Sequence, residues 1–223
     1  MTMQTGLRDL GEIEGKVLLF GGPYSNLQAT QALIAEAQAR GIAPANAICT
    51  GDLVAYGADP VATARAVMSW GAAVVAGNCE RQLAEVAPDC GCGFDAGSAC
   101  DLLSKGWYPY AAARVSDELR RSFAALPDMI RFDHAGRRYA VLHGGARDNS
   151  RFVWPDAPDA VFADERHAVE AVAGPVDAII AGHCGIAFQR HAAGIDWINP
   201  GVIGLPPHDG RPMTRFGLLD ADG

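Results

Sequence analysis

Short apolar runs alternate with longer amphipathic segments over the first third of the chain. The apolar runs are bounded by glycine and are typical of buried strands, while the amphipathic segments carry apolar residues at helical spacing. The predicted strands are 16–20, 47–50 and 72–76, and the predicted helices between them are 25–40, with Ser25 or Asn26 as N-cap, and 60–70. A strand–helix–strand order implies parallel strands joined by right-handed crossovers, and therefore the α/β class.

The pattern changes after residue 81. Residues 81–127 predict helices and loops, interrupted by Cys90-Gly91-Cys92-Gly93, whereas short strand-like runs return from Met129 onward. The predicted strands are 130–134, 138–142, 178–180, 186–191, 196–198 and about 216–219, with one helix at about 163–173. Without an internal repeat or a low-complexity linker, we predict one domain over residues 1–223, with two sheets and an insertion at about 81–127.

Composition narrows the class of function. Lys and Arg number 18 against 26 Asp and Glu, a net charge of −8, which argues against a nucleic-acid polymer as partner because phosphate backbones are held by clustered basic residues. The sequence contains no apolar run of roughly 18 residues and no basic, cleavable start, so we expect no membrane partner and a cytoplasmic location. In such a reducing compartment the six cysteines are expected to be thiols or metal ligands.

Polar residues follow four of the predicted strands at the point where each strand ends. They are Asp52, Asn78, His143 and His183, each beside one or two glycines. Because the carboxyl ends of strands line the ligand crevice of an α/β sheet, these side chains are expected to converge. One carboxylate, one amide oxygen and two imidazoles suit a divalent ion such as Mn²⁺, Fe²⁺ or Zn²⁺. The pattern therefore predicts a metal site.

The same motifs, in the same order, resemble those of the calcineurin-like metallophosphoesterases. The motifs are Gly51-Asp52, Gly77-Asn78, His143-Gly144, Gly182-His183 and Asn199-Pro200-Gly201, and the stretch from Gly51 to Pro60 is most similar to the small bacterial phosphodiesterases and diadenosine-tetraphosphatase-like members. The resemblance covers nearly the whole chain. It implies an α/β fold, a four-layer α/β/β/α sandwich of two mixed sheets, with metal bound at strand ends.

The resemblance is complete for one of the family's two metal positions only. The Asp-x-His pair that opens the family's pattern is replaced by Gly22 and Tyr24, and the second His of its Gly-His-x-His motif is replaced by Gly185. The ligands that the family uses for the other ion all survive, as Asp52, Asn78, His143 and His183. The resemblance therefore implies a reduced site with one divalent ion per chain.

Cysteines lie beside the predicted ligands. Cys79 stands where the family has its catalytic His, and with Asp52 and His143 it is a candidate catalytic residue. Its thiol could donate a proton weakly, ligate the metal or act as a nucleophile; alternatively it is a small buried residue. Cys79 and Cys184 are candidate thiol ligands, which would favour zinc or iron over manganese. Cys90, Cys92 and Cys100 lack zinc-ribbon spacing, and an ordinary loop of free thiols is the alternative.

The first loop leads directly into a predicted helix. Without a carboxylate at Gly22, free backbone N–H groups and the helix dipole would favour a phosphate or carboxylate there, with Tyr24, Ser25 and Asn26 contributing; a plain capped turn is the alternative. Candidate cationic or rim contacts to the ligand are Arg81, Arg147, Arg211 and His208, each of which is otherwise a solvated residue.

Taken with the resemblance, these residues predict a metal-dependent phosphoesterase. The expected substrate is a small phosphomonoester or phosphodiester, with nucleotides among the candidates. The alternative is a non-catalytic protein of the same fold that binds a metal or a small phosphorylated ligand. The sequence does not specify the oligomeric state.

Overall fold

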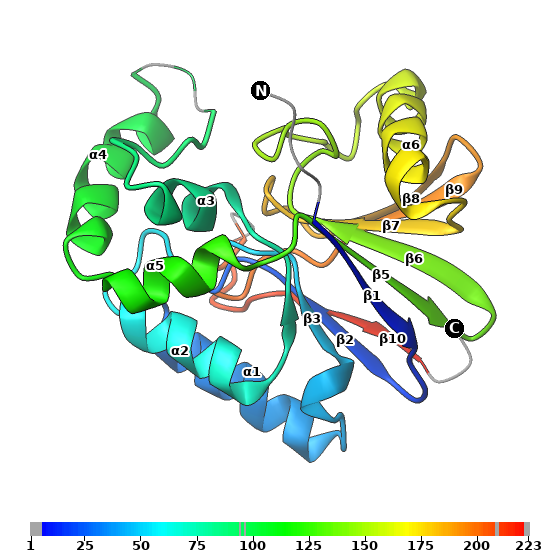
Figure 1. Ribbon diagram of the computed structural model, residues 1–223, viewed down its shortest axis with the longest axis horizontal. Coiled ribbons are helices and arrows are strands. Elements are labelled where there is room, and N and C mark those ends of the chain that lie inside the picture. Colours follow the sequence, from blue (N-terminus) through cyan, green and yellow to red (C-terminus); the bar gives the residue numbers. More distant parts are fainter. Residues whose placement is uncertain (1–5, 94, 96, 208–209, 221–223) are drawn as a thin grey trace.

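The computed structural model describes residues 6–93, 95, 97–207 and 210–220 of the chain (Figure 1). The strands are β1 (Leu7–Glu12), β2 (Val17–Phe20), β3 (Ala47–Cys49), β4 (Ala73–Val74), β5 (Met129–His134), β6 (Arg137–Leu142), β7 (Ala178–Ala181), β8 (Phe188–Ala192), β9 (Ile195–Asn199) and β10 (Gly217–Leu219). The helices are α1 (Leu27–Ala39), α2 (Pro60–Trp70), α3 (Asn78–Ala84), α4 (Ala99–Ala112), α5 (Asp117–Ala124) and α6 (Asp159–Ala173), with a 3₁₀ turn at Pro44–Asn46. None of the helices in the described ranges has the length and apolar character needed to cross a lipid bilayer.

The strands form two mixed sheets. The larger has the order β1-β5-β6-β7-β9-β8 and the smaller the order β10-β2-β3-β4. Within the smaller sheet β2, β3 and β4 are parallel and β10 is antiparallel to β2, while the larger sheet combines the parallel run β6-β7-β9 with antiparallel β5 and β8. The α/β class and the two mixed sheets are therefore as the sequence predicts.

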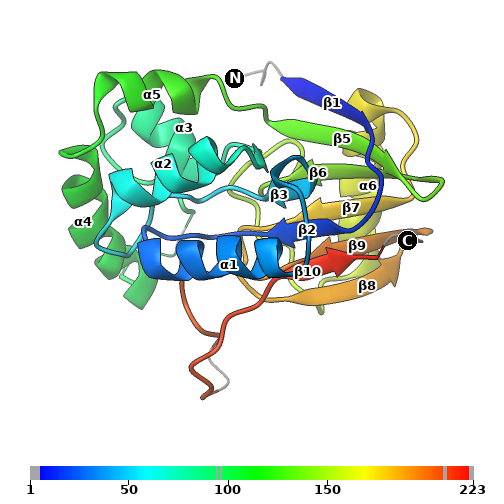
Figure 2. The ribbon, with the colours of Figure 1, turned by 90° about the horizontal axis from the view of Figure 1, so that it is seen from below.

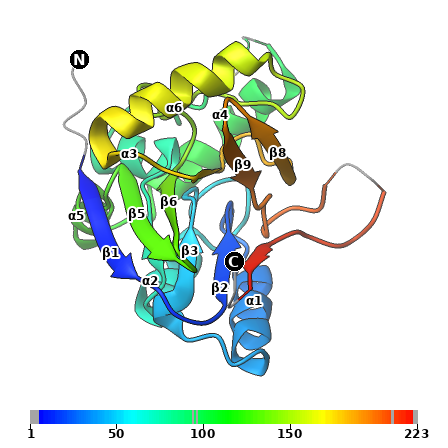
Figure 3. The same ribbon diagram turned by 90° about the vertical axis from the view of Figure 1, so that its right-hand side faces the viewer.

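Alternating side chains along the strands fill three separate apolar layers. On β2, Val17 and Leu19 face the core shared by both sheets, whereas Leu18 and Phe20 pack under the helices beside the smaller sheet. The central strands of the larger sheet divide their residues in the same way between the shared core and α6. Three apolar layers between four layers of structure give the α/β/β/α sandwich, with α6 and α1 on opposite outer sides in Figure 3.

Strand β1 is absent from the sequence prediction. It lies at the edge of the larger sheet, parallel to β5, and its residues are half-buried or exposed (Figure 2). An edge strand of this kind is stabilised by backbone pairing and carries charged side chains, so it lacks the apolar pattern used to recognise a strand. Its first register pair is Leu7 with Met129.

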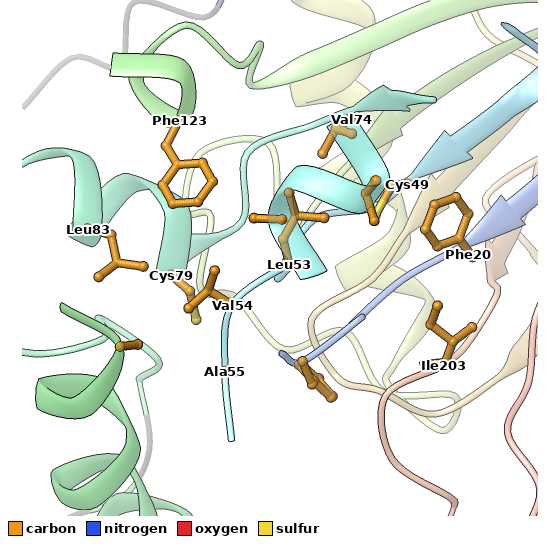
Figure 4. Packing of buried hydrophobic residues seen from close by; sticks show 14 of the residues in the cluster. Phe20, Cys49, Leu53, Val54, Ala55, Val74, Cys79, Leu83, Phe123 and Ile203 are labelled. Carbon is orange, nitrogen blue, oxygen red and sulfur yellow. The ribbon is translucent and has the colours of Figure 1, made fainter. Parts of the chain in front are cut away.

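Helices α3, α4 and α5 occupy the segment predicted as an insertion. Trp107 and Tyr108 of α4 and Phe123 of α5 join the apolar cluster that covers the smaller sheet. Figure 4 shows Phe123, Leu83 and Cys79 within this cluster. The segment therefore packs directly against the part of the fold that carries the ends of β3 and β4.

Candidate metal centre

The four predicted ligands come from the ends of four strands, two in each sheet. Asp52 follows β3 and Asn78 follows β4 in the smaller sheet, while His143 and His183 follow β6 and β7 in the larger one. Asp52 and His183 both have a φ of 57°, a left-handed conformation that side-chain-bearing residues rarely adopt. Two parallel strand ends from each of two facing sheets thus deliver the side chains to one place.

The donor atoms of these residues converge on Nε2 of His143. That nitrogen lies 3.0 Å from Asn78 Oδ1, 3.1 Å from His183 Nδ1 and 3.4 Å from Asp52 Oδ1. The four residues are each 9 % exposed or less, so few water molecules can reach their donors. Such proximity of four donors, with two imidazoles edge to face, is the arrangement of a cation site.

Backbone carbonyls orient two of the ligands. His143 Nδ1 lies 2.6 Å from the carbonyl oxygen of Thr50, so this nitrogen carries the proton and Nε2 is left with its lone pair toward the site. The Asn78 side-chain amide donates to the carbonyl of Cys90 at 2.8 Å, which turns its oxygen toward His143. Gly51 has a φ of 95°, and a Cβ there would lie 2.6 Å from the Gly77 nitrogen. Glycine at this position therefore allows the loops that carry Asp52 and Asn78 to lie close together.

The residues fit a divalent cation. Asp52 Oδ1 is buried and has no hydrogen-bond partner among the described residues, which is costly for a carboxylate oxygen unless a cation neutralises it. Burial, and secondly the nearby His143, lower the pKa of His183 to about 4, so its imidazole is neutral and can ligate. Asp52, His143 and His183 bring one ligand atom each to within 4.8 Å of one another.

The second metal position of the family does not fit an ion in this chain. Tyr24 is buried and its ring lies beside both glycines that replace family ligands: a Cβ on Gly22 would be 2.8 Å from Tyr24 Cζ, and one on Gly185 would be 3.8 Å from its hydroxyl. Burial, and secondly the Asp52 carboxylate, raise the pKa of Tyr24 far above its usual value, so the phenol is neutral. A neutral ring therefore lies where the family pattern has ionic ligands.

The backbone amides of the first loop are not free. Those of Gly22, Tyr24 and Ser25 donate to the carbonyls of residues 51, 52 and 53, at 3.1, 3.2 and 2.9 Å, and extend the pairing of β2 with β3. Asn26 is the N-cap of α1 and its side chain accepts from the Ala29 amide at 3.0 Å. The expectation of free N–H groups is wrong, since every one of these amides has a backbone acceptor; the alternative, a capped turn, describes the loop.

One pair of cysteines takes a different role from the one expected. Cys90 and Cys92 are joined by a disulfide, which corrects the expectation of free thiols or ligands for this pair. Cys79 is buried beside Asp52, and burial and then that carboxylate raise the pKa of its thiol, so it is present as the neutral S–H. Cys184 Sγ lies 3.2 Å from the amide nitrogen of Asn199. The side chain of Cys100 lies outside the described residues.

Two of the candidate cationic residues, Arg81 and Arg147, are engaged in ion pairs. Arg81 forms an ion pair with Asp128 and donates to the carbonyl of Leu126, so its guanidinium holds α3 to the segment that precedes β5. Arg147 pairs with Asp164 of α6. His208 lies outside the described residues.

Glu80 is a positioning residue that is not among the site residues predicted from the sequence. It is the fourth residue of the stretch Gly77-Asn78-Cys79-Glu80. Its buried carboxylate accepts from the backbone amides of Asp52, Gly77 and Val54 at 2.9, 3.0 and 3.2 Å. Burial, and secondly Asp52, raise the pKa of Glu80, while these three donors stabilise its ionised form. Glu80 thereby ties together the two loops that carry Asp52 and Asn78.

Comparisons with known proteins agree with this fold. The fold is similar to a metallophosphoesterase from Sphaerobacter thermophilus (TM-score 0.68, 18% identity, 94% of this chain and 85% of that chain covered) and to a hypothetical protein from Pyrococcus horikoshii (TM-score 0.68, 15% identity, 92% and 87% covered). It is also similar to a phosphoesterase from E. coli (TM-score 0.50, 17% identity, 92% and 88% covered). None of the curated proteins compared with the sequence matches it. The family model of the calcineurin-like phosphoesterase superfamily domain matches residues 25–223, and the chain therefore belongs to this superfamily.

Proposed function

We propose that the protein is a metal-dependent phosphoesterase that uses one divalent ion. Asp52, Asn78, His143 and His183 would hold the ion, which we infer to be Mn²⁺, Fe²⁺ or Zn²⁺ from their mixed oxygen and nitrogen donors. The substrate is a small phosphomonoester or phosphodiester, nucleotides included. The observation that carries the proposal is the convergence of these four buried donors around His143 Nε2, where Asp52 Oδ1 has no hydrogen-bond partner in the described part of the chain.

The chain's own residues contribute positioning and neutral donors. A bound divalent ion supplies stabilisation of the negative charge that develops on the phosphoryl oxygens. The Thr50 carbonyl and the Glu80 carboxylate keep the ligand-bearing loops in place before any substrate arrives. The Tyr24 hydroxyl and the Cys79 thiol, both neutral, border the same cavity as Asp52 and can donate hydrogen bonds to a ligand there.

The test is a hydrolysis assay with chromogenic phosphomonoesters and phosphodiesters, after chelator treatment and addition of Mn²⁺, Zn²⁺, Fe²⁺ or Mg²⁺ one at a time. We expect metal-dependent turnover that falls at least about 100-fold in His143→Ala, since even residues that only orient ligands cost 10–100-fold. His167→Ala is the matched control, because His167 is an exposed histidine of α6. Equal activity of His143→Ala and the control would contradict the proposal.

A second function, ligand binding without turnover, is favoured by two observations. Tyr24 lies at the second metal position, and Cys79 replaces the residue that the family uses to protonate the leaving group. Metal binding is measured on the same protein samples. This second function is indicated if the wild type binds metal, His143→Ala does not, and neither turns over any substrate.

A further inference from the structure

An aromatic cavity of about 310 Å³ lies beside the metal centre. Asp52 and His183 border it on the side of the metal ligands, and Trp154 and Ile186, which are 42 % and 46 % exposed, lie at its outer side. This volume is at the lower end of the range of roughly 300–1,000 Å³ typical of small-molecule sites. The cavity therefore has room for one ring system next to a phosphoryl group at the metal centre.

Aromatic rings line the cavity on two sides. Phe152 stacks on Trp154 with the ring centres 5.2 Å apart and also contacts His183 at 4.3 Å. Tyr56 packs against the edges of Tyr24 at 5.0 Å and Trp107 at 5.4 Å. These rings come from four separate parts of the chain: the loop after β2, the loop after β3, helix α4 and the loop after β6. Flat apolar walls of this kind favour a planar ring as occupant.

Trp107 contributes a further aromatic ring to one wall of the cavity. Its side chain is 8 % exposed, and its indole nitrogen is inaccessible to solvent and has no hydrogen-bond partner among the described residues.

The charge of the cavity limits the number of phosphates. Among the described residues that border it there is no Lys or Arg, and Asp52 adds negative charge. A separate, larger cavity of about 1030 Å³ is lined by Arg8 and by Arg81, whose guanidinium is paired with Asp128. A chain of several phosphates would find no countercharge beside the aromatic walls, so only the phosphate at the metal centre is accommodated.

We propose that the substrate is an ester of a single phosphate whose alcohol part carries one planar aromatic ring, bound between the Trp154 and Trp107 sides of the cavity. The proposal rests on the proposed function for the phosphate and on the cavity for the ring. Nucleoside monophosphates and simple aryl-containing phosphates share this chemistry, whereas dinucleoside polyphosphates do not.

Binding of the ring is measured first, without phosphate or metal. Adenosine or benzyl alcohol is added to the full chain, and the four tryptophan indole N–H signals are followed by NMR, assigned with single Trp→Phe variants. We expect the signals of Trp107 and Trp154 to shift and those of Trp70 and Trp197 to stay. Shifts with both probes indicate that any planar ring binds, and shifts with adenosine alone indicate a nucleobase site. No shift with either probe overturns the proposal.

Turnover is then compared for substrate pairs that differ by the ring. AMP is compared with ribose 5-phosphate, and benzyl phosphate with ethyl phosphate, whose alcohols are leaving groups of similar basicity. We expect kcat/KM to be at least about 10-fold higher for the partner with the ring, since stacking of a base on an aromatic side chain contributes about 1–3 kcal/mol. Diadenosine tetraphosphate is expected to be a poor substrate, and a kcat/KM above that of AMP overturns the proposal.

Variants separate the cavity from the metal centre. Trp154→Ala should remove most of the ring preference, measured as the ratio of kcat/KM for AMP to that for ribose 5-phosphate, and Trp154→Phe should restore part of it. Leu102→Ala, an exposed apolar truncation on α4 at 60 % exposure, is the matched control. Ring preference retained in Trp154→Ala overturns the proposal. If the indole signals shift but no substrate is turned over, the ring site is supported and the proposed function is refuted. If substrates are turned over without indole shifts and without ring preference, the proposed function is supported and the ring site is refuted.

Discussion

The Tyr24 side chain lies beside the two glycines, Gly22 and Gly185, that replace metal ligands of the family. Gly22 has a φ of 47°, and a Cβ on it would meet Val202 Cγ1 at 2.5 Å as well as the Tyr24 ring. The space of a metal ligand is therefore filled by neighbouring side chains, and the loss of the ligands is matched by packing. Restoring a single family residue would have to displace a buried ring.

The first prediction concerns Gly22→Ala. It is expected to lower the free energy of unfolding by about 1–3 kcal/mol through overpacking, in addition to the roughly 1–2 kcal/mol of left-handed backbone strain. Gly136→Ala is the matched control, because Gly136 has a φ of 73° but nothing within 4 Å of its would-be Cβ. Urea unfolding measures both variants, and an equal loss in the two would contradict the packing argument.

A second prediction concerns Glu80→Gln. The Glu80 carboxylate accepts hydrogen bonds from three backbone N–H groups. The side-chain NH₂ of Gln would face one of these N–H groups, so that two donors meet without an acceptor. We therefore expect the free energy of unfolding to fall by about 1–3 kcal/mol. Metal affinity should also fall about 10-fold or more, because the loops of Asp52 and Asn78 lose their common acceptor. Glu85→Gln, at the exposed end of α3, is the control. Calorimetric metal titration that gives equal affinities would refute this role.

At this scale the sequence identifies donor residues better than their partners. The four residues could be predicted because each comes shortly after the end of an apolar strand. They are Asp52, Asn78, His143 and His183. The carbonyls of Thr50 and Cys90, which orient His143 and Asn78, could not be, since any residue offers a carbonyl and only the folded loops decide which one is near. The Cys90–Cys92 pairing likewise depends on the local turn and not on composition.

At the scale of elements, buried strands were predicted and the exposed edge strand was not. The observed β8 begins at Phe188 and α6 at Asp159, two residues later and four residues earlier than the pattern indicates. Such ends depend on partners across the sheet, which a local pattern does not contain. Ion pairs between neighbouring strands are one kind of interaction that stabilises the ends of strands.

Asp196 of β9 provides the third prediction. It accepts from His191 of β8 at 2.8 Å and pairs with Arg137 of β6, so one carboxylate connects three strands of the larger sheet. Hydrogen bonds, from His191 first and then Arg137, lower the pKa of Asp196. Asp196→Asn should cost only about 0.5–1 kcal/mol of unfolding free energy at pH 7, because the partners are partly exposed and solvent screens the pair.

The pH dependence of that loss follows from the lowered pKa. A carboxylate with a depressed pKa in the folded state stabilises the fold above its unfolded pKa, 3.8, and loses this effect as the pH falls through the folded value. The difference between wild type and Asp196→Asn should therefore shrink as the pH falls below about 4. Urea unfolding at pH 5, 4 and 3 is the measurement, and a difference that does not shrink between pH 4 and 3 would contradict it.

At the scale of the whole molecule, the metal centre joins the two sheets. Asp52 and Asn78 follow strands of the smaller sheet, and His143 and His183 follow strands of the larger one. The contacts among these four side chains connect the two sheets, in addition to the apolar core between them. The net charge of −8 leaves the unliganded Asp52 carboxylate in an already acidic molecule. Cation binding should thus affect the stability of the entire sandwich.

The last prediction is that a bound divalent ion stabilises the fold as a unit. At 100 times its Kd, an ion that binds only the folded state adds about 2.7 kcal/mol, or roughly 5–10 °C in Tm for a chain of this length. Calorimetry with and without Mn²⁺ or Zn²⁺ measures the shift. In His143→Gln it should vanish whatever the starting Tm, whereas in His167→Gln it should persist. A shift that survives in His143→Gln would place the ion elsewhere, and the ion would then not be the link between the two sheets.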